Sequence, residues 1–298
     1  MCSDQCQGSV FITYIPPLLH EVVVLICYHP QPFIRAPSHS IFAKLGARIA
    51  FLGVDARTER TRERTNYRET YDCLFARVNM ELDLATRSGR PTKHLILLFG
   101  IPLAYPPLTW VENAFKGSAG RSFQRLSDRI NVGRAAMNKF DGAIELLDDL
   151  NDHYTSAVHQ DERRYIIERI QSVCAMHSVR ATILSGDVHL AAVGRFFTTH
   201  KCDIPPIEED FRFMNNIISS AIVNQPPPLA MAQLIAQADK IRNINAETEE
   251  ILFKLFRSDS NSDPGSSSSS KSEKKQEGGT TVAMPRRNYT IFLLEKET

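Results

Sequence analysis

The sequence predicts an α/β fold with mixed strand pairing, and three observations support this. Short runs rich in aliphatic and β-branched residues are bounded by chain breakers, as is typical of buried strands. Two longer stretches repeat apolar residues at three- and four-residue steps, which is the spacing of one helix face. The strands are apolar throughout and alternate with the helices, which indicates a partly parallel sheet covered by helices on at least one face.

Each expected element has a local reason. The helical spacing runs from Tyr71 to Ala85 and again from Tyr165 to Cys174, and a further helix, Leu229–Lys240, follows three prolines. A last strand, Ile291–Leu294, is expected to return to the core. The remaining expected strands are Val22–Cys27, Arg48–Val54, His94–Phe99, Val179–Leu184 and Asn216–Ile222.

Composition excludes several classes of protein. The 298 residues are 43% hydrophobic, which excludes collagen-like, coiled-coil and globally disordered chains. The net charge of +1 provides no field that would attract nucleic acid, so nucleic acid is not an expected partner. Six scattered cysteines without a CxxC pair predict free thiols and a cytoplasmic location. No transmembrane span or lipidation signal is evident, and peripheral membrane association stays open.

The stretch from Val179 to Gly194 carries the clearest chemistry. Its strand ends at Ser185-Gly186, and Asp187 and His189 follow. In extended backbone, residues two apart point to the same side, so both side chains would project from the carboxyl end of a strand, where α/β sheets bind ligands. A carboxylate with an imidazole suits Fe, Mn or Zn. The alternative is a capping aspartate beside a surface histidine.

Two further segments hold weaker candidates. Arg57 follows the Arg48–Val54 strand with Asp55 and has the geometry to hold a phosphate oxygen. A structural role, in which both residues pair with neighbours and fix the loop, is favoured. Asn151, Asp152 and His153 lie in a loop that could approach the same site. The alternative there is that Asp152 caps the following helix.

Several motifs occur in the order typical of one family. The Gly186–His189 segment, GDVH, resembles the closing metal motif of PhoD-like metallophosphoesterases. The other segments resemble the fungal members of that branch: Ser38–Ser40 with Leu45-Gly46, Phe51–Arg64, Gly100–Tyr105 with Trp110 and Glu112, Asn138–Tyr154, Ile218–Pro228 and Arg286–Tyr289.

This resemblance implies a metallophosphoesterase-like α/β/β/α sandwich with mixed sheets. It implies a phosphatase that hydrolyses phosphomono- or phosphodiesters through a metal-activated water, with Fe, Ca, Mn or Zn as the ion. Asp187 and His189, with Asp152 as a weaker candidate, would be the metal ligands. The phosphate contact of Arg57 rests on its position after the strand and not on this resemblance.

The sequence departs from the family pattern at its N-terminal end. The metal-ligand motifs of the N-terminal half are not found, so residues 1–36 are expected to be divergent or truncated and residues 37–257 to form the C-terminal two-thirds of the domain. Residues 258–280 are expected to be a disordered Ser/Lys/Glu-rich insert, and residues 281–298 to return to the domain. The alternative function is a catalytically impaired remnant that acts as an interaction protein, with a partner over an exposed sheet face.

Overall fold

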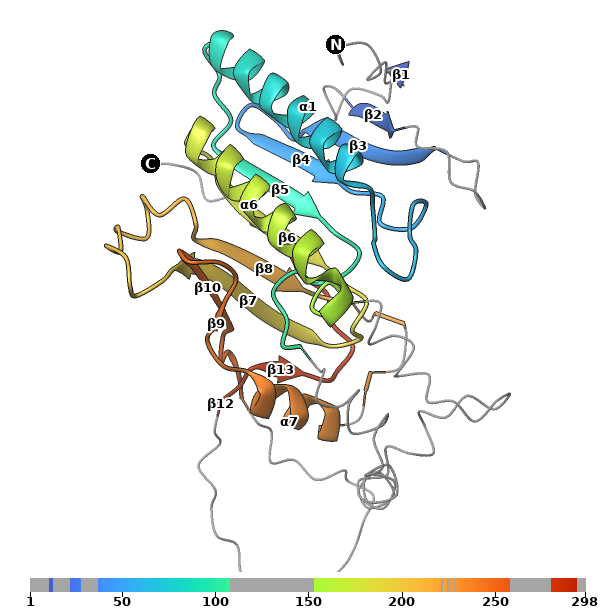
Figure 1. The fold of residues 1–298 in the computed structure, drawn as a ribbon, viewed down its shortest axis with the longest axis vertical. Coiled ribbons are helices and arrows are strands. Elements are labelled where there is room, and N and C mark those ends of the chain that lie inside the picture. The colour runs from blue at the N-terminus through green and yellow to red at the C-terminus, as the bar shows by residue number, and fades with distance from the viewer. Residues whose placement is uncertain are drawn as a thin grey trace, which may run out of the picture.

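A computed structural model describes residues 11–12, 22–27, 37–107, 153–220, 222–223, 226–227, 229–257 and 280–293. The strands in these ranges form an eleven-stranded sheet, in the order β1-β2-β3-β4-β5-β6-β8-β7-β10-β9 with β13 paired to β7, and a separate pair, β11 and β12. Helices alternate with strands along the chain and lie against the large sheet (Figure 1). The predicted α/β fold with mixed pairing is confirmed.

The centre of the sheet is parallel. Its four strands are β4 (Ile49–Gly53), β5 (His94–Leu98), β6 (Arg180–Ser185) and β8 (Met214–Ile218). Three of them lie within one residue of the predicted bounds. The fourth begins two residues earlier than predicted and ends at Ile218, four residues before the predicted end, and it includes the buried polar Asn216.

Antiparallel strands flank this centre. On one side are β1 (Phe11–Ile12), β2 (Val22–Cys27) and β3 (Ser38–Lys44), and on the other are β7 (Ala191–Thr198), β10 (Thr248–Leu252), β9 (Arg242–Asn243) and β13 (Ala283–Met284). The separate pair is β11 (Phe256–Arg257) with β12 (Thr280–Thr281). The prediction of a last strand at Ile291–Leu294 was wrong over residues 291–293, which are exposed and unpaired in the sheet; the returning strand is β13.

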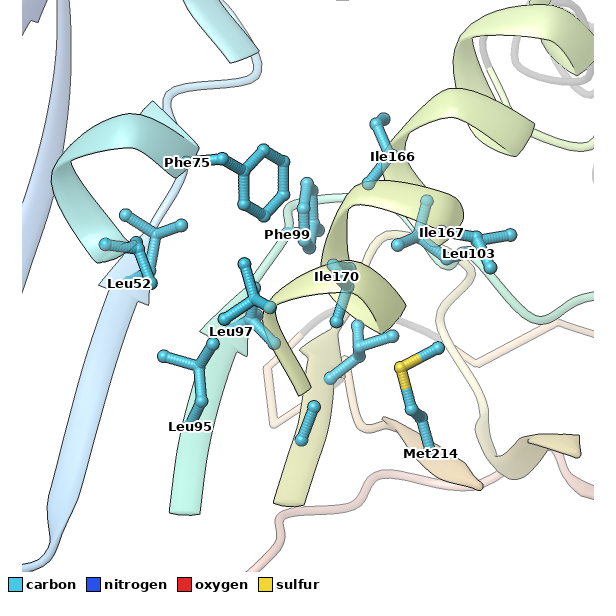
Figure 2. Packing of buried hydrophobic residues seen from close by; sticks show 14 of the residues in the cluster. Leu52, Phe75, Leu95, Leu97, Phe99, Leu103, Ile166, Ile167, Ile170 and Met214 are labelled. Atoms are coloured by element: carbon cyan, nitrogen blue, oxygen red, sulfur yellow. The ribbon is translucent and has the colours of Figure 1, made fainter. Parts of the chain in front are cut away.

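Two helices cover one face of the sheet. They are α1 (Arg68–Arg87) and α6 (Gln160–His177), which lie side by side in Figure 1. Figure 2 shows Phe75 of α1 beside Phe99, and Ile166 and Ile170 of α6 belong to the same buried cluster. A short 3-10 turn, η1 (Ala157–His159), leads into α6.

A third helix, α7 (Leu229–Ala238), completes a second apolar cluster. Its Ala232 and Ile235 are buried with Ala192 of β7 and Ala283 of β13. No helix in the described ranges is long and apolar enough to cross a membrane.

The opposite face of the sheet has an apolar row that the described helices do not cover. Strand register aligns Ile41, Gly53, Leu98, Leu184 and Ile217 across five neighbouring strands. Because side chains alternate along a strand, this row faces away from Leu52, Leu97 and Ile183, which are buried in the core. Ile41 is 41% exposed and Leu98 is 42% exposed, and we call this side the open face.

Gly194 allows the segment after β5 to lie directly on β7. A Cβ atom at position 194 would lie 2.5 Å from the Ala104 Cβ and 2.9 Å from the Ala104 carbonyl oxygen. We therefore expect Gly194→Ala to lower the free energy of unfolding in urea by about 1–3 kcal/mol, because the backbone must move. Gly100→Ala is the control, since its Cβ would meet no atom nearer than 3.9 Å. Equal stability of the two variants would contradict this account.

Candidate functional site

The carboxyl ends of the parallel strands meet at one edge of the sheet. Backbone hydrogen bonds continue between neighbouring strands at this edge and align the residues that follow them. Val54 N donates to Leu98 O at 3.0 Å, Phe99 N to Leu184 O at 2.9 Å, and Ser219 N to Ser185 O at 2.9 Å. Asp55, Gly100, Asp187 and Ser219 all follow this edge. The fold therefore places the segments from four motifs together, where α/β sheets bind ligands.

The Asp187 loop does not have the extended backbone that was predicted. Asp187 has a φ of 73° and His189 a φ of 54°, so both lie in the left-handed region. The alternation of side chains along a strand therefore does not decide where these two side chains point. The argument from extended backbone that placed them on the same side was wrong. Left-handed residues other than glycine are uncommon and cluster at functional sites. Asp187 and His189 are both exposed.

His153 is the residue that the structure brings to Asp187. Its Nε2 lies 3.8 Å from the Asp187 Oδ2, and its side chain is 11% exposed. The Tyr105 ring packs edge-on against the His153 ring at 5.9 Å between centroids. Asn151 and Asp152 lie outside the described residues. Of the loop residues considered from the sequence, His153 is thus the one with an observed contact in the site.

Tyr105 is held in place by its own segment. The buried Asn216 Oδ1 accepts hydrogen bonds from the backbone N–H groups of Leu103 and Ala104 at 2.9 and 2.8 Å. Its Nδ2 donates to the Ser185 Oγ at 2.8 Å, at the end of β6. The buried Asn216 carboxamide therefore joins the Tyr105 segment to β6, the strand that precedes Asp187.

A buried arginine supports the same segment from α6. Arg163 Nε donates to the Leu103 carbonyl oxygen at 2.7 Å, and its guanidinium also pairs with Glu250. Arg242 contacts the second oxygen of Glu250 at 3.1 Å. Both charges of the inner pair are buried, so removal of Glu250 would leave the Arg163 charge unpaired in the core, whereas removal of Arg163 would leave Glu250 with Arg242 alone.

A polar network links the loop after β4 to the start of α6. The Glu162 carboxylate accepts the Thr65 N–H at 2.9 Å, the Asn66 N–H at 2.9 Å and the Tyr71 hydroxyl at 2.8 Å. The Tyr71 hydroxyl also lies 3.2 Å from that of Tyr154, the neighbour of His153. Burial alone would raise the pKa of Glu162, but these hydrogen bonds and one with His159 lower it below the ordinary value.

Asp55 organises its loop. Its carboxylate accepts the His39 N–H at 2.9 Å, the Arg57 N–H at 3.0 Å and the Thr58 hydroxyl at 2.6 Å. Burial alone would raise the pKa of Asp55, but the hydrogen bonds outweigh it and lower the pKa. The favoured structural role of Asp55 agrees with these contacts. Arg57 is exposed, and its backbone N–H takes part in this loop.

The chain near its C-terminus also reaches this edge. Asn288 is 8% exposed, and its Oδ1 accepts the Ser219 hydroxyl at 2.8 Å while its Nδ2 donates to the Arg286 carbonyl oxygen at 2.9 Å. The motif that contains Asn288 is therefore fixed beside the end of β8.

The metal-ligand inventory of the site is small. Within the part of the chain that the structure describes, there is no cluster of three or more His, Cys, Asp or Glu residues that could hold a metal ion. Asp187 and His153 form the pair with an observed contact, and His189 belongs to the same loop as Asp187.

One family model matches more than half of the chain. Residues 131–297 match the family model described as PhoD related phosphatase. The uncharacterized protein YGR266W of Saccharomyces cerevisiae is 40% identical over 239 residues, which are 75% of this chain and 33% of that protein. The chain thus spans about a third of the length of this curated relative. The solved structure titled "Structure of PhoD" is 13% identical, covers 61% of this chain and 28% of its own, and has a TM-score of 0.32.

Stability should depend on pH through Glu162. Because its pKa is lowered on folding, its carboxylate stabilises the fold above the ordinary value of 4.5, and this contribution is lost as the pH falls below that value. We expect Glu162→Gln to lower the free energy of unfolding at pH 7 by about 2 kcal/mol, and less at pH 3. The exposed Glu168, on the same helix, provides Glu168→Gln as the control. Denaturant unfolding at both pH values measures this. An equal loss of the free energy of unfolding in Glu162→Gln at pH 7 and pH 3 would contradict it.

Proposed function

The chain belongs to the PhoD-related phosphatase family, and from this we propose that it hydrolyses phosphomono- or phosphodiesters through a metal-activated water. The observation that carries the proposal is the contact between Asp187 and His153 at the carboxyl edge of the parallel strands. Asp187 and His189 have left-handed backbone, which costs free energy and clusters at functional sites. A buried imidazole beside a carboxylate in such a loop therefore favours a function for the pair. Its location is the ligand edge of an α/β sheet.

The donor set fits a metal ion in part. A carboxylate oxygen and an imidazole nitrogen 3.8 Å apart suit one coordination sphere of Fe, Mn or Zn, whereas Ca prefers oxygen ligands. In this proposal Asp187, His189 and Asp152 would be ligands, and the contact of His153 with Asp187 makes His153 a further candidate. A bound ion of this kind lowers the pKa of its water and neutralises phosphoryl charge. The described residues alone supply too few donors for a two-metal centre.

The side chains of the site have separate roles in this proposal. Asp187 holds His153 in register, and the Tyr105 ring fixes the plane of the imidazole. His153 would thereby stay beside the proposed ligands Asp187 and His189. Arg57, after β4 on the same edge, contacts the phosphate oxygens.

The domain organisation is also part of the proposal. Residues 37–257 would form the C-terminal two-thirds of the phosphatase domain, and the pairing of β13 with β7 supports the return of residues 281–298. Most of residues 1–36 and of the expected insert at 258–280 lie outside the described residues. The cytoplasmic location stays a prediction.

The phosphatase proposal is tested by removing the charge of Asp187. Asp187→Asn keeps a residue that tolerates the left-handed backbone, so the loop should persist. We expect metal-stimulated hydrolysis of a chromogenic phosphoester to fall at least about 100-fold, because even residues behind a ligand cost up to that much. Asp161→Asn is the control, since its side chain is 92% exposed. Metal-stimulated activity that survives Asp187→Asn would refute this assignment.

The open face favours a second candidate function. Its apolar row crosses five strands and includes side chains more than 40% exposed, which is typical of a surface that another protein covers. We propose that, if catalysis is lost, the chain acts as an interaction protein through this face.

A charge on the open face tests this second candidate. Ile96 lies between Phe51 and Thr182 in the next cross-strand row. We expect the purified chain to associate, and Ile96→Lys to shift it toward the monomer in light scattering coupled to size exclusion, because the lysine would be buried at the interface. Met176→Lys, at a 64% exposed position on α6, is the control. A wild-type chain that is a monodisperse, cooperatively unfolding monomer would contradict association.

A further inference from the structure

A cavity of about 610 Å³ opens beside the Asp187 loop. Gly186, the residue before Asp187, lines it, so the cavity adjoins the candidate reaction site. Its size is that of a small-molecule site, for which volumes of about 300–1,000 Å³ are usual. None of the described residues that line it carries a charge.

The floor of the cavity is part of the open face. Leu98, Leu184 and Ile217 are aligned by strand register and all three line the cavity. Val54 and Ile222 add further apolar surface. The floor therefore offers a continuous hydrocarbon surface immediately before the strands end.

Two hydroxyl groups of the lining are already bonded within the protein. The Ser219 hydroxyl bonds to Asn288, and the Ser185 hydroxyl accepts the Asn216 amide. A ligand rich in hydroxyl or charged groups would lose its bonds to water here without full replacement. The lining therefore favours an apolar ligand.

The cavity wall comes from the C-terminal segment. Asn288 anchors this segment to Ser219, and Tyr289 and Phe292 line the cavity. The neighbouring residue Leu293 is 89% exposed and is not part of the lining. Phe292 and Leu293 thus form a matched pair, with one side chain in the wall and one outside it.

We propose that this cavity binds the leaving group of the phosphoester, so that the site prefers esters of apolar alcohols or phenols. This inference rests on the proposed phosphatase function and specifies its substrate class. In this proposal the phosphate lies at Asp187 and His153, and the leaving group enters the cavity past Gly186, the lining residue next to Asp187, and covers Leu184 and Ile217. Each methylene buried in this way should strengthen binding about fourfold.

The test uses the full chain with added Mn²⁺ and two non-hydrolysable probes. We expect hexylphosphonate to bind at least about tenfold more tightly than methylphosphonate in calorimetry, since several methylenes would be buried. Phe292→Ala should reduce that ratio at least about threefold, and Leu293→Ala should leave it unchanged. Hexanol binding, followed by saturation-transfer NMR without metal, reports on the cavity alone and should weaken in Phe292→Ala.

The outcomes separate the two proposals. Equal binding of the two phosphonates, or equal effects of Phe292→Ala and Leu293→Ala, overturns the leaving-group cavity and leaves the phosphatase proposal standing. If hexanol binds and depends on Phe292 while neither phosphonate binds, the phosphatase proposal fails and the leaving-group role fails with it. If a protein partner or another part of the chain fills the cavity, hexanol does not bind, which also overturns the proposal.

Discussion

The buried carboxamide of Asn216 is the contact on which the rest of the site depends. It sits in the middle of a parallel strand, where a polar group is costly unless all its hydrogen bonds are made. Its oxygen accepts two backbone N–H groups from the segment after β5, and its nitrogen reaches the end of β6. The strand that precedes Asp187 and the segment that contains Tyr105 are therefore joined, and His153 contacts both Tyr105 and Asp187.

The central strands and the three α-helices of the described ranges could be predicted because their apolar spacing is local. Among the strands that the sequence did not indicate, the longer ones, β3, β7 and β10, have polar or small residues whose burial depends on distant partners. In β10, Glu249 and Glu250 are buried, which a hydropathy pattern does not predict, because His200 and Arg163 pair with them. The last strand of the sheet was predicted at the apolar segment Ile291–Leu294. The strand that pairs with β7 is instead the short Ala283–Met284.

The candidate site was predicted in part. The GDVH motif identified the loop, but the left-handed backbone at Asp187 and His189 depends on tertiary packing that no pattern of residue types encodes. The proximity of His153 to Asp187 could not follow from sequence spacing, since 33 positions separate them and the contact needs the fold. The structural interpretation of Asp55 agrees with the structure, because a carboxylate shortly after a strand commonly accepts the N–H groups of the next turn.

The pairing of β11 with β12 has a consequence for how this chain can vary in length. Phe256 faces Thr281 and Arg257 faces Thr280, so the two ends of the intervening connection are held side by side by backbone pairing of their own. Closing a longer connection costs only about 0.6 kcal/mol for each doubling of its length. Insertions or deletions between these two strands should therefore leave the sheet and the site almost unaffected. This connection is a natural place to graft a tag, a reporter or a whole domain.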